Sequence, residues 1–154
     1  MSNSNLEQLP QLVQSRVNEG GTRDEILLDI CKLINQKLDA YDWVGFYIVD
    51  PTQERMLKLG PYVGDETDHI YIPFGKGICG QAAETLETFV IDDVNKESNY
   101  LSCSINVKSE IVVPVFKNGE FIAELDIDSH KIAAFGKKDQ EIMEEICRII
   151  EPVF

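Results

Sequence analysis

Apolar residues recur at helical spacing near both ends of the chain. The pattern predicts helices over residues 6–17, 22–38 and 138–151. The second helix opens with a capping box, because Thr22 and Glu25 lie three residues apart. One face of the last helix is formed by four isoleucines, namely Ile142, Ile146, Ile149 and Ile150.

The middle of the chain is built from short runs of β-branched and aromatic residues. These runs predict strands over residues 43–50, 55–59, 69–72, 89–91, 110–116 and 120–127. Between them we expect a loop at 60–65 and a short helix that begins near Cys79, after a turn crowded by glycines. Residues 92–107 are polar and irregular, and they hold Cys103. A loop of this length in a compact domain is usually functional or disordered.

Hairpins join most of the predicted strands. Asn118 and Gly119 give the strongest two-residue turn signal, which pairs Lys117 with Glu120. Such connections favour an α+β fold with a central, mostly antiparallel sheet and helices packed on it. The 154 residues, 44% of them hydrophobic, suit one domain. We divide it into N-terminal helices (1–40), a sheet with active-site loops (41–137) and a C-terminal helix (138–154).

The charge of the chain narrows the choice of partner. Asp and Glu number 27 against 14 Lys and Arg, for a net charge of −13. A field of this sign repels phosphate groups, so we expect neither nucleic acid nor an anionic membrane as a partner. A cationic or zwitterionic small ligand fits better.

We also predict a cytoplasmic location. No stretch reaches the roughly 20 apolar residues of a membrane span, and the first residues lack the basic start and apolar run of a signal peptide. Thiols in that compartment rest reduced. Because His69 and His130 lie far from any cysteine pair, and no Cys-x-x-Cys occurs, we predict no metal site.

The four cysteines differ in their surroundings. Cys79 lies where a glycine-rich turn opens a helix, and helix N-termini lower the pKa of a thiol. Cys103 lies in the polar loop, where packing has little use for a cysteine. Cys31 and Cys147 lie in predicted helices and are interpreted as apolar core residues. Cys79 and Cys103 are therefore the candidate redox pair.

Three acids gather near the ends of the last hairpin. Counted back from the turn, Glu110 falls opposite Ile127, and Asp126 and Asp128 flank that position on one common face, unless a bulge shifts the register. Acids on one face cannot all ionise freely, so one could stay protonated near neutral pH. Such a group could bind an ammonium and also donate a proton.

Structural interpretations of these residues stay open at this point. The three acids could form an ordinary solvated face of the sheet. Trp43 and Tyr47 could be core or strand-pairing residues. What favours a functional interpretation is the combination, because redox chemistry needs two thiols and an acid.

Five stretches resemble the free methionine-(R)-sulfoxide reductases, a catalytic family with the GAF fold. They are WVGFY (43–47), LGPYVG (59–64), IPFGKGICG (72–80), SEIVVP (109–114) and LDIDS (125–129). They occur in the order of the family and cover roughly the central two-thirds of the chain. The resemblance implies a GAF-like domain that reduces free L-methionine-(R)-sulfoxide to methionine without metal or organic cofactor.

The resemblance also implies the role of each residue. Cys103 matches the attacking cysteine and becomes a sulfenic acid, and Cys79 matches a resolving cysteine that closes a disulfide with it. Thioredoxin or a similar dithiol would then restore the enzyme. The residues that match Glu110, Asp126 and Asp128 bind the substrate and assist its protonation, and Glu110 and Asp128 share the acid role. The residues that match Trp43 and Tyr47 line the pocket, with Trp43 against the substrate methyl group.

The chain departs from many family members in one stretch. Residues 65–71 lack the third cysteine that those members carry, so the resemblance is to a two-cysteine form. Two alternatives come from other functional classes, a non-catalytic GAF ligand sensor and a redox sensor. GAF domains often pair through terminal helices, so we predict a homodimer by analogy.

Overall fold

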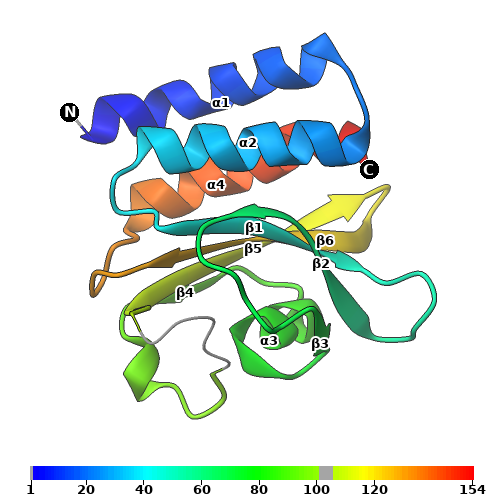
Figure 1. Ribbon diagram of the computed structural model, residues 1–154, viewed down its shortest axis with the longest axis vertical. Helices are drawn as coiled ribbons and strands as arrows, with labels where there is room; N and C mark the ends of the chain where they lie inside the picture. The colour runs from blue at the N-terminus through cyan, green and yellow to red at the C-terminus, as the bar shows by residue number, and fades with distance from the viewer. Residues whose placement is uncertain (1, 101–105) are drawn as a thin grey trace.

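The computed structural model describes residues 2–100 and 106–154, in which six strands form one antiparallel sheet of order β3-β2-β1-β6-β5-β4 (Figure 1). The strands are β1 (Trp43–Val49), β2 (Met56–Val63), β3 (Tyr71–Pro73), β4 (Phe89–Ile91), β5 (Ser109–Lys117) and β6 (Glu120–Ser129). The helices are α1 (Ser2–Glu19), α2 (Arg23–Lys37), α3 (Gly77–Thr85) and α4 (Lys137–Ile149), with 3-10 turns η1 (Val94–Lys96) and η2 (Glu151–Val153). The predicted α+β class and antiparallel sheet are confirmed.

Helices cover both faces of this sheet, but unequally. Helices α2 and α4 pack on one face and α1 lies across both of them, whereas α3 lies on the other face beside β3 (Figure 1). Val44, Phe46 and Leu125 point toward α2 and α4 and are fully buried in the larger core. The face toward α3 is lined by a second, smaller cluster that includes Trp43 and Cys79.

A local sequence signal accounts for the start of α2. The Thr22 hydroxyl accepts the N–H of Glu25, and the Glu25 carboxylate accepts the N–H of Thr22, so the predicted capping box is confirmed. Helix α1 begins at Ser2, earlier than the apolar pattern indicated. Among the described residues, no helix combines the length and apolar character needed to cross a membrane.

The β5–β6 hairpin turns where the sequence predicted, but its register shifts. Asn118 (φ 53°) and Gly119 (φ 81°) both adopt the left-handed backbone of a type I′ turn, and Lys117 pairs with Glu120. Phe116 pairs with Phe121, but the next residue of β5 away from the turn pairs with Ala123, so β6 carries one extra residue, Ile122, at a bulge. All pairs further from the turn therefore move by one position relative to the prediction.

Strand β2 is longer than predicted. Residues 60–63 were expected to be a loop but continue the strand, because a bulge accommodates the Gly60-Pro61 pair. The pairs flanking it are Tyr47 with Leu59 and Gly45 with Tyr62, so two residues of β2 face one of β1. A bulge tolerates a proline, which cannot donate to the ladder.

Candidate functional site

The face of the sheet opposite α2 and α4 gathers the predicted site residues. Along β1 and β6, Trp43 pairs with Asp128 and Tyr47 pairs with Glu124, while Gly45 lies opposite Asp126. Paired residues of antiparallel strands share a face. All of these side chains therefore lie beneath α3, together with Val112 and Glu110 of β5.

The bulge decides which acids meet. Glu110 lies directly opposite Asp128, not opposite Ile127 as predicted. In the predicted register Glu110 would have shared the face of Ile127, which points toward the helical core. The one-residue shift at Ile122 brings Glu110 onto the face of Asp126 and Asp128 instead. The common face that the sequence suggested is present, but for a different geometric reason.

Cys79 meets these acids from above. It is the third residue of α3 and is 5% exposed. The Cys79 thiol and carboxylate oxygens of Glu110 and Asp126 all lie within 4.8 Å of one another. Among the described residues, this is the group of thiol and acids that could hold a cation, whether a metal ion or an ammonium.

A tight turn sets the height of α3 above the sheet. Gly75 has φ +90°, and its N–H donates to the carbonyl of Gly80 over 2.8 Å. A Cβ on Gly80 would come within 2.6 Å of the Pro73 carbonyl oxygen. The glycines predicted to crowd this turn therefore allow the backbone to fold closely enough to bring Cys79 down onto the acids.

A small cavity lies between the start of α3 and the sheet. Its described lining is Tyr47, His69, Ile72, Lys76, Gly77, Ile78, Cys79, Glu110 and Asp126. A wider, more open hollow lies between α4 and β5 and is lined in part by Glu144 and Arg148. Of these two hollows, the small cavity combines a thiol with buried acids.

Aromatic residues form one wall beside this cavity. The Trp43 indole stacks on Tyr62 with ring centres 5.2 Å apart, and the ring of Tyr47 lies 6.4 Å away. The indole N–H donates to the Asp65 carbonyl over 3.0 Å. A Cβ on Gly45 would approach the indole to 2.5 Å, so the glycine in WVGFY is what lets Trp43 lie flat across the strand.

The residues before β3 are attached to the same wall. The Tyr47 hydroxyl donates to the carbonyl oxygen of His69 over 2.8 Å, and the Tyr47 side chain is fully buried. His69 was not singled out for the pocket in the sequence. Its place in the cavity lining arises from the turn before β3, which no local motif indicated.

Burial raises the pKa of three carboxyl groups in the site. For Glu124 and Asp128 the pKa lies well above its ordinary value, because burial disfavours the charged form and the charge of Asp126 adds to it. Burial also raises the pKa of Asp126. Hydrogen bonds with the Glu110 side chain and with the Cys79 thiol lower this pKa and offset part of the rise. A hydrogen bond between two carboxyl groups requires a proton on one of them. The cluster therefore retains protons near neutral pH.

The pKa of Cys79 contradicts the sequence-based expectation. A position near a helix N-terminus should lower it, but burial raises it well above its ordinary value, and the charges of Asp126, Glu124, Glu110 and Asp128 raise it further. The helix dipole is a modest effect confined to the first turn. Desolvation next to acids outweighs it, so Cys79 rests as a neutral thiol.

Glu124 is a member of the cluster that the sequence analysis missed. It is fully buried, and both of its carboxylate oxygens are without a hydrogen-bond partner among the described residues. One oxygen each of Asp126 and Asp128 is likewise unpartnered among them. The period-2 alternation in AELDIDS would have found Glu124, because it places residues 124, 126 and 128 on one face.

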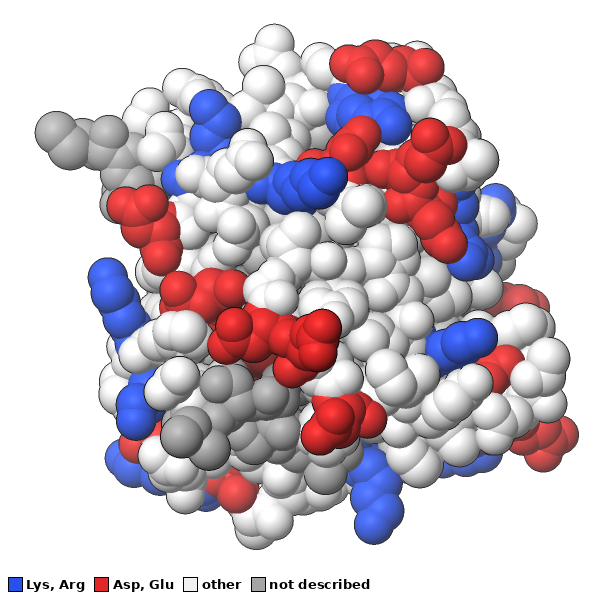
Figure 2. Space-filling view, viewed as in Figure 1, with Lys and Arg blue, Asp and Glu red and all other residues white. Residues whose placement is uncertain are grey.

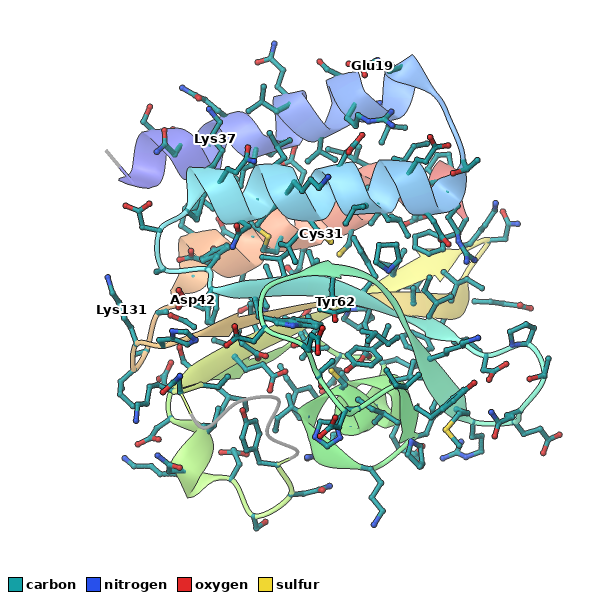
Figure 3. All side chains as sticks on the ribbon, viewed as in Figure 1. Glu19, Cys31, Lys37, Asp42, Tyr62 and Lys131 are labelled. Atoms are coloured by element: carbon teal, nitrogen blue, oxygen red, sulfur yellow. The ribbon has the colours of Figure 1, made fainter. Side chains whose placement is uncertain are left out.

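The other cysteines fall into two groups. Cys31 and Cys147 are buried on the helical side of the sheet, and burial raises the pKa of both thiols. Figure 3 shows Cys31 between α2 and the sheet, on the side opposite α3. Cys103 lies outside the described residues, so its position relative to Cys79 stays a prediction.

Acidic side chains also predominate on the outer surface. Figure 2 shows that Asp and Glu cover more of the viewed face than Lys and Arg do, in keeping with the net charge of −13. The site therefore lies in a molecule whose overall field attracts cationic groups.

Comparison with known proteins identifies relatives of the same architecture. The GAF domain family profile matches residues 22–152. The free methionine-R-sulfoxide reductase of Saccharomyces cerevisiae is 35% identical over 158 residues, which cover 96% of this chain and 87% of the yeast protein.

Solved structures agree with this result. The free methionine-R-sulfoxide reductase of Neisseria meningitidis, in complex with its substrate, matches with a TM-score of 0.94 at 32% identity, covering 100% of this chain and 90% of that one. The fRMsr of Staphylococcus aureus, also in complex with substrate, matches with a TM-score of 0.87 at 37% identity, covering 97% and 95% of the two chains.

Proposed function

Because the chain belongs to the GAF-domain family of free methionine-R-sulfoxide reductases, we propose that it reduces free L-methionine-(R)-sulfoxide to methionine with Cys103 and Cys79. The single observation that carries the proposal is the meeting of the Cys79 thiol with Glu110 and Asp126, within 4.8 Å, at a small cavity. A thiol among partly protonated acids combines the reductant and the proton source that a sulfoxide requires.

The acids account for recognition of a free amino acid. Asp126 lines the cavity and has an unpartnered oxygen among the described residues, so it is placed to accept the substrate ammonium. An internal methionine sulfoxide of a protein carries an amide where the free amino acid carries this ammonium. The Trp43 indole, stacked on Tyr62, offers an apolar surface for the methyl group on sulfur.

In the first step the Cys103 sulfur attacks the sulfoxide sulfur while a carboxylic acid protonates the sulfoxide oxygen. Glu110 and Asp128 share this acid role, which their direct opposition across the strands and their hydrogen bond support. The S–O bond breaks, methionine leaves, and Cys103 ends as a sulfenic acid. The Cys103 sulfur gains the oxygen and gives up two electrons, and the sulfoxide sulfur loses the oxygen and accepts them, so no external oxidant is needed.

In the second step the Cys79 sulfur attacks the sulfenic sulfur. The S–S bond forms as the S–O bond of the sulfenic acid breaks. The hydroxyl group of the sulfenic acid takes the proton of the Cys79 thiol and leaves as water. Cys79 rests as a neutral thiol, which suits a residue that reacts second, because a neutral thiol competes poorly for the sulfoxide. Thioredoxin or a similar dithiol then reduces the disulfide by exchange.

Two alternative functions make different predictions. A ligand sensor would bind methionine or its sulfoxide without turnover, and a redox sensor would oxidise with peroxide at least as fast as with the sulfoxide. The free methionine-R-sulfoxide reductases among the relatives favour the reductase. A cytoplasmic location and a homodimer stay predictions.

The test is an NADPH-coupled assay with thioredoxin and thioredoxin reductase. We expect NADPH oxidation with free methionine-(R)-sulfoxide, and little with the S epimer or with the N-acetylated R epimer, which has lost the ammonium. Cys103→Ser should abolish turnover, whereas Cys31→Ser should retain it. The proposal fails if no dithiol supports turnover on the free R epimer.

A further inference from the structure

The loop that leads to Cys103 is bound to the helix that carries Cys79 through one asparagine. The Gly77 N–H donates to Asn99 Oδ1 over 2.9 Å, and Asn99 Nδ2 donates to the carbonyl of Gly75 over 2.7 Å. Gln81 Nε2 donates to the carbonyl oxygens of both Asn99 and Gly77, over 3.0 and 2.9 Å. We call these four hydrogen bonds the Asn99 clip.

The clip replaces a missing local cap. Helix α3 begins at Gly77, and its N-cap residue, Lys76, makes no side-chain capping hydrogen bond. A helix start leaves several N–H groups without a partner within the helix. Asn99, 22 residues further along the chain, satisfies one of them. A cap supplied from such a distance ties the loop to α3 as well as completing the helix.

Both candidate thiols lie a few residues from this clip. Cys79 follows Gly77 by two positions, and Cys103 follows Asn99 by four. Since an extended chain spans about 3.3–3.6 Å per residue, four residues reach at most ~14 Å from Asn99. A disulfide needs the two Cα atoms within ~7 Å of each other. The clip therefore limits how far Cys103 can lie from the first turn of α3, because Asn99 is bound to that turn.

Without the clip, the nearest described anchor lies further back. The Val94 N–H donates to the carbonyl of Lys108 over 2.8 Å, which closes the base of the loop. Thirteen residues, 95–107, separate these two anchored positions. With the clip, eight residues, 100–107, separate Asn99 from Lys108. A shorter segment with one end held beside Cys79 raises the effective concentration of one thiol at the other.

We propose that Asn99, supported by Gln81, is a positioning residue for closure of the Cys79–Cys103 disulfide. The physiological role of this closure rests on the proposed function, but the effect on the thiol pair does not. Asn99 touches neither reacting sulfur in this scheme. It acts by holding the loop against the first turn of α3, so less conformational entropy is lost when the two sulfurs meet for the resolving attack.

An equilibrium experiment tests the clip without relying on catalysis. The disulfide is formed with diamide and equilibrated with reduced and oxidised glutathione, in a background where Cys31 and Cys147 are alanine. In Asn99→Ala we expect the equilibrium constant for the disulfide to fall about tenfold, which moves the reduction potential up by about 30 mV. Asn99→Asp keeps the acceptor for the Gly77 N–H but loses the donor to the Gly75 carbonyl. Its equilibrium constant should lie between those of the wild type and Asn99→Ala.

Two control variants separate positioning from general loss of stability. Asn95→Ala changes an exposed side chain of the same loop, outside the clip. Thr22→Ala removes the cap of α2, far from the site, and costs stability in a comparable way. Both should leave the reduction potential unchanged. An unchanged potential in Asn99→Ala, or an equal shift in Thr22→Ala, overturns the proposal.

A kinetic experiment then asks whether the clip acts on the resolving step. After one equivalent of free methionine-(R)-sulfoxide, Asn99→Ala should release methionine at the wild-type rate but retain sulfenic acid, trapped with dimedone, about ten times longer. Equal slowing of both steps overturns the assignment to resolution. Absence of methionine release from the wild type refutes the proposed function, while the equilibrium experiment still decides the clip.

Discussion

Glu110 and Asp128 lie directly opposite each other across β5 and β6, and the extra residue Ile122 is what aligns them. A regular hairpin counted from the Asn-Gly turn would have placed Glu110 opposite Ile127, on the face that packs against the helices. The bulge moves one acid by one residue and thereby changes its face. The hydrogen bond between the two carboxyl groups requires a proton on one of them, and this is the proton that the proposed acid role needs.

We predict that each of these acids is needed for the first chemical step. Glu110→Gln and Asp128→Asn keep the shape of the side chain but remove the acid, so single-turnover methionine release should slow by about a hundredfold or more. Quenched-flow measurement of methionine gives the rate. Glu120→Gln, at the exposed hairpin turn, is the matched control and should release methionine normally. Full activity in both site variants would refute the shared acid role.

The buried, unpartnered Glu124 predicts how stability depends on pH. Its pKa in the folded protein is raised, so the folded state holds a proton that the unfolded state releases above about pH 4.5. Stability should therefore fall as pH rises from about 5 toward its raised pKa, with a slope of up to ~1.4 kcal/mol per pH unit from this group. Asp126 and Asp128 act in the same direction.

Glu124→Gln isolates the contribution of this one acid. Urea denaturation between pH 5 and 8 should show a flatter pH dependence than the wild type, and greater stability at pH 8. Glu54→Gln, an exposed glutamate, should reproduce the wild-type slope. A pH dependence that is identical in Glu124→Gln and the wild type would show that Glu124 does not hold its proton.

Gly45 is predicted to be essential for the shape of the aromatic wall. A Cβ there would lie 2.5 Å from the Trp43 indole and 2.6 Å from the Cβ of Tyr62, so Gly45→Ala must displace the indole. We expect a loss of about 1–3 kcal/mol in stability and a raised KM for the sulfoxide. Gly136→Ala, where the nearest atom is 3.7 Å away, should change both little. An unchanged KM in Gly45→Ala would remove Trp43 from the substrate pocket.

Cys31 and Cys147 are predicted to be inert. Burial raises the pKa of both thiols, and they lie on the far side of the sheet from Cys79. The double variant Cys31→Ala/Cys147→Ala should therefore keep wild-type turnover while losing about 1–3 kcal/mol of stability through the lost packing. Alkylation of the native protein with iodoacetamide, followed by mass spectrometry, should leave both residues unmodified. Loss of turnover at unchanged fold would contradict a purely structural role.

Part of the fold and site follows from local sequence signals. Thr22 and Glu25 predict the start of α2, and Asn118-Gly119 predicts the turn of the last hairpin. Both the capping box and the turn depend on residues three or fewer positions apart. The gathering of Asp126 and Asp128 on one face follows from the period of a strand. These signals need no knowledge of the rest of the chain.

The remainder depends on packing between distant segments. A thiol near a helix start is expected to be acidic, but the pKa of Cys79 is raised because strand β6 buries acids beneath it. The place of Glu110 depends on a bulge at Ile122, and the course of residues 60–63 on another at Gly60. The clip at Asn99 spans 22 residues, beyond the reach of any local pattern.

The most direct test of the central claim counts the methionine released per chain. Reduced enzyme is mixed with excess free methionine-(R)-sulfoxide in the absence of any reductant. We predict about one methionine per chain from the wild type and from Cys79→Ser, which stalls as a sulfenic acid, and none from Cys103→Ser. Methionine release from Cys103→Ser equal to that of the wild type would contradict this prediction.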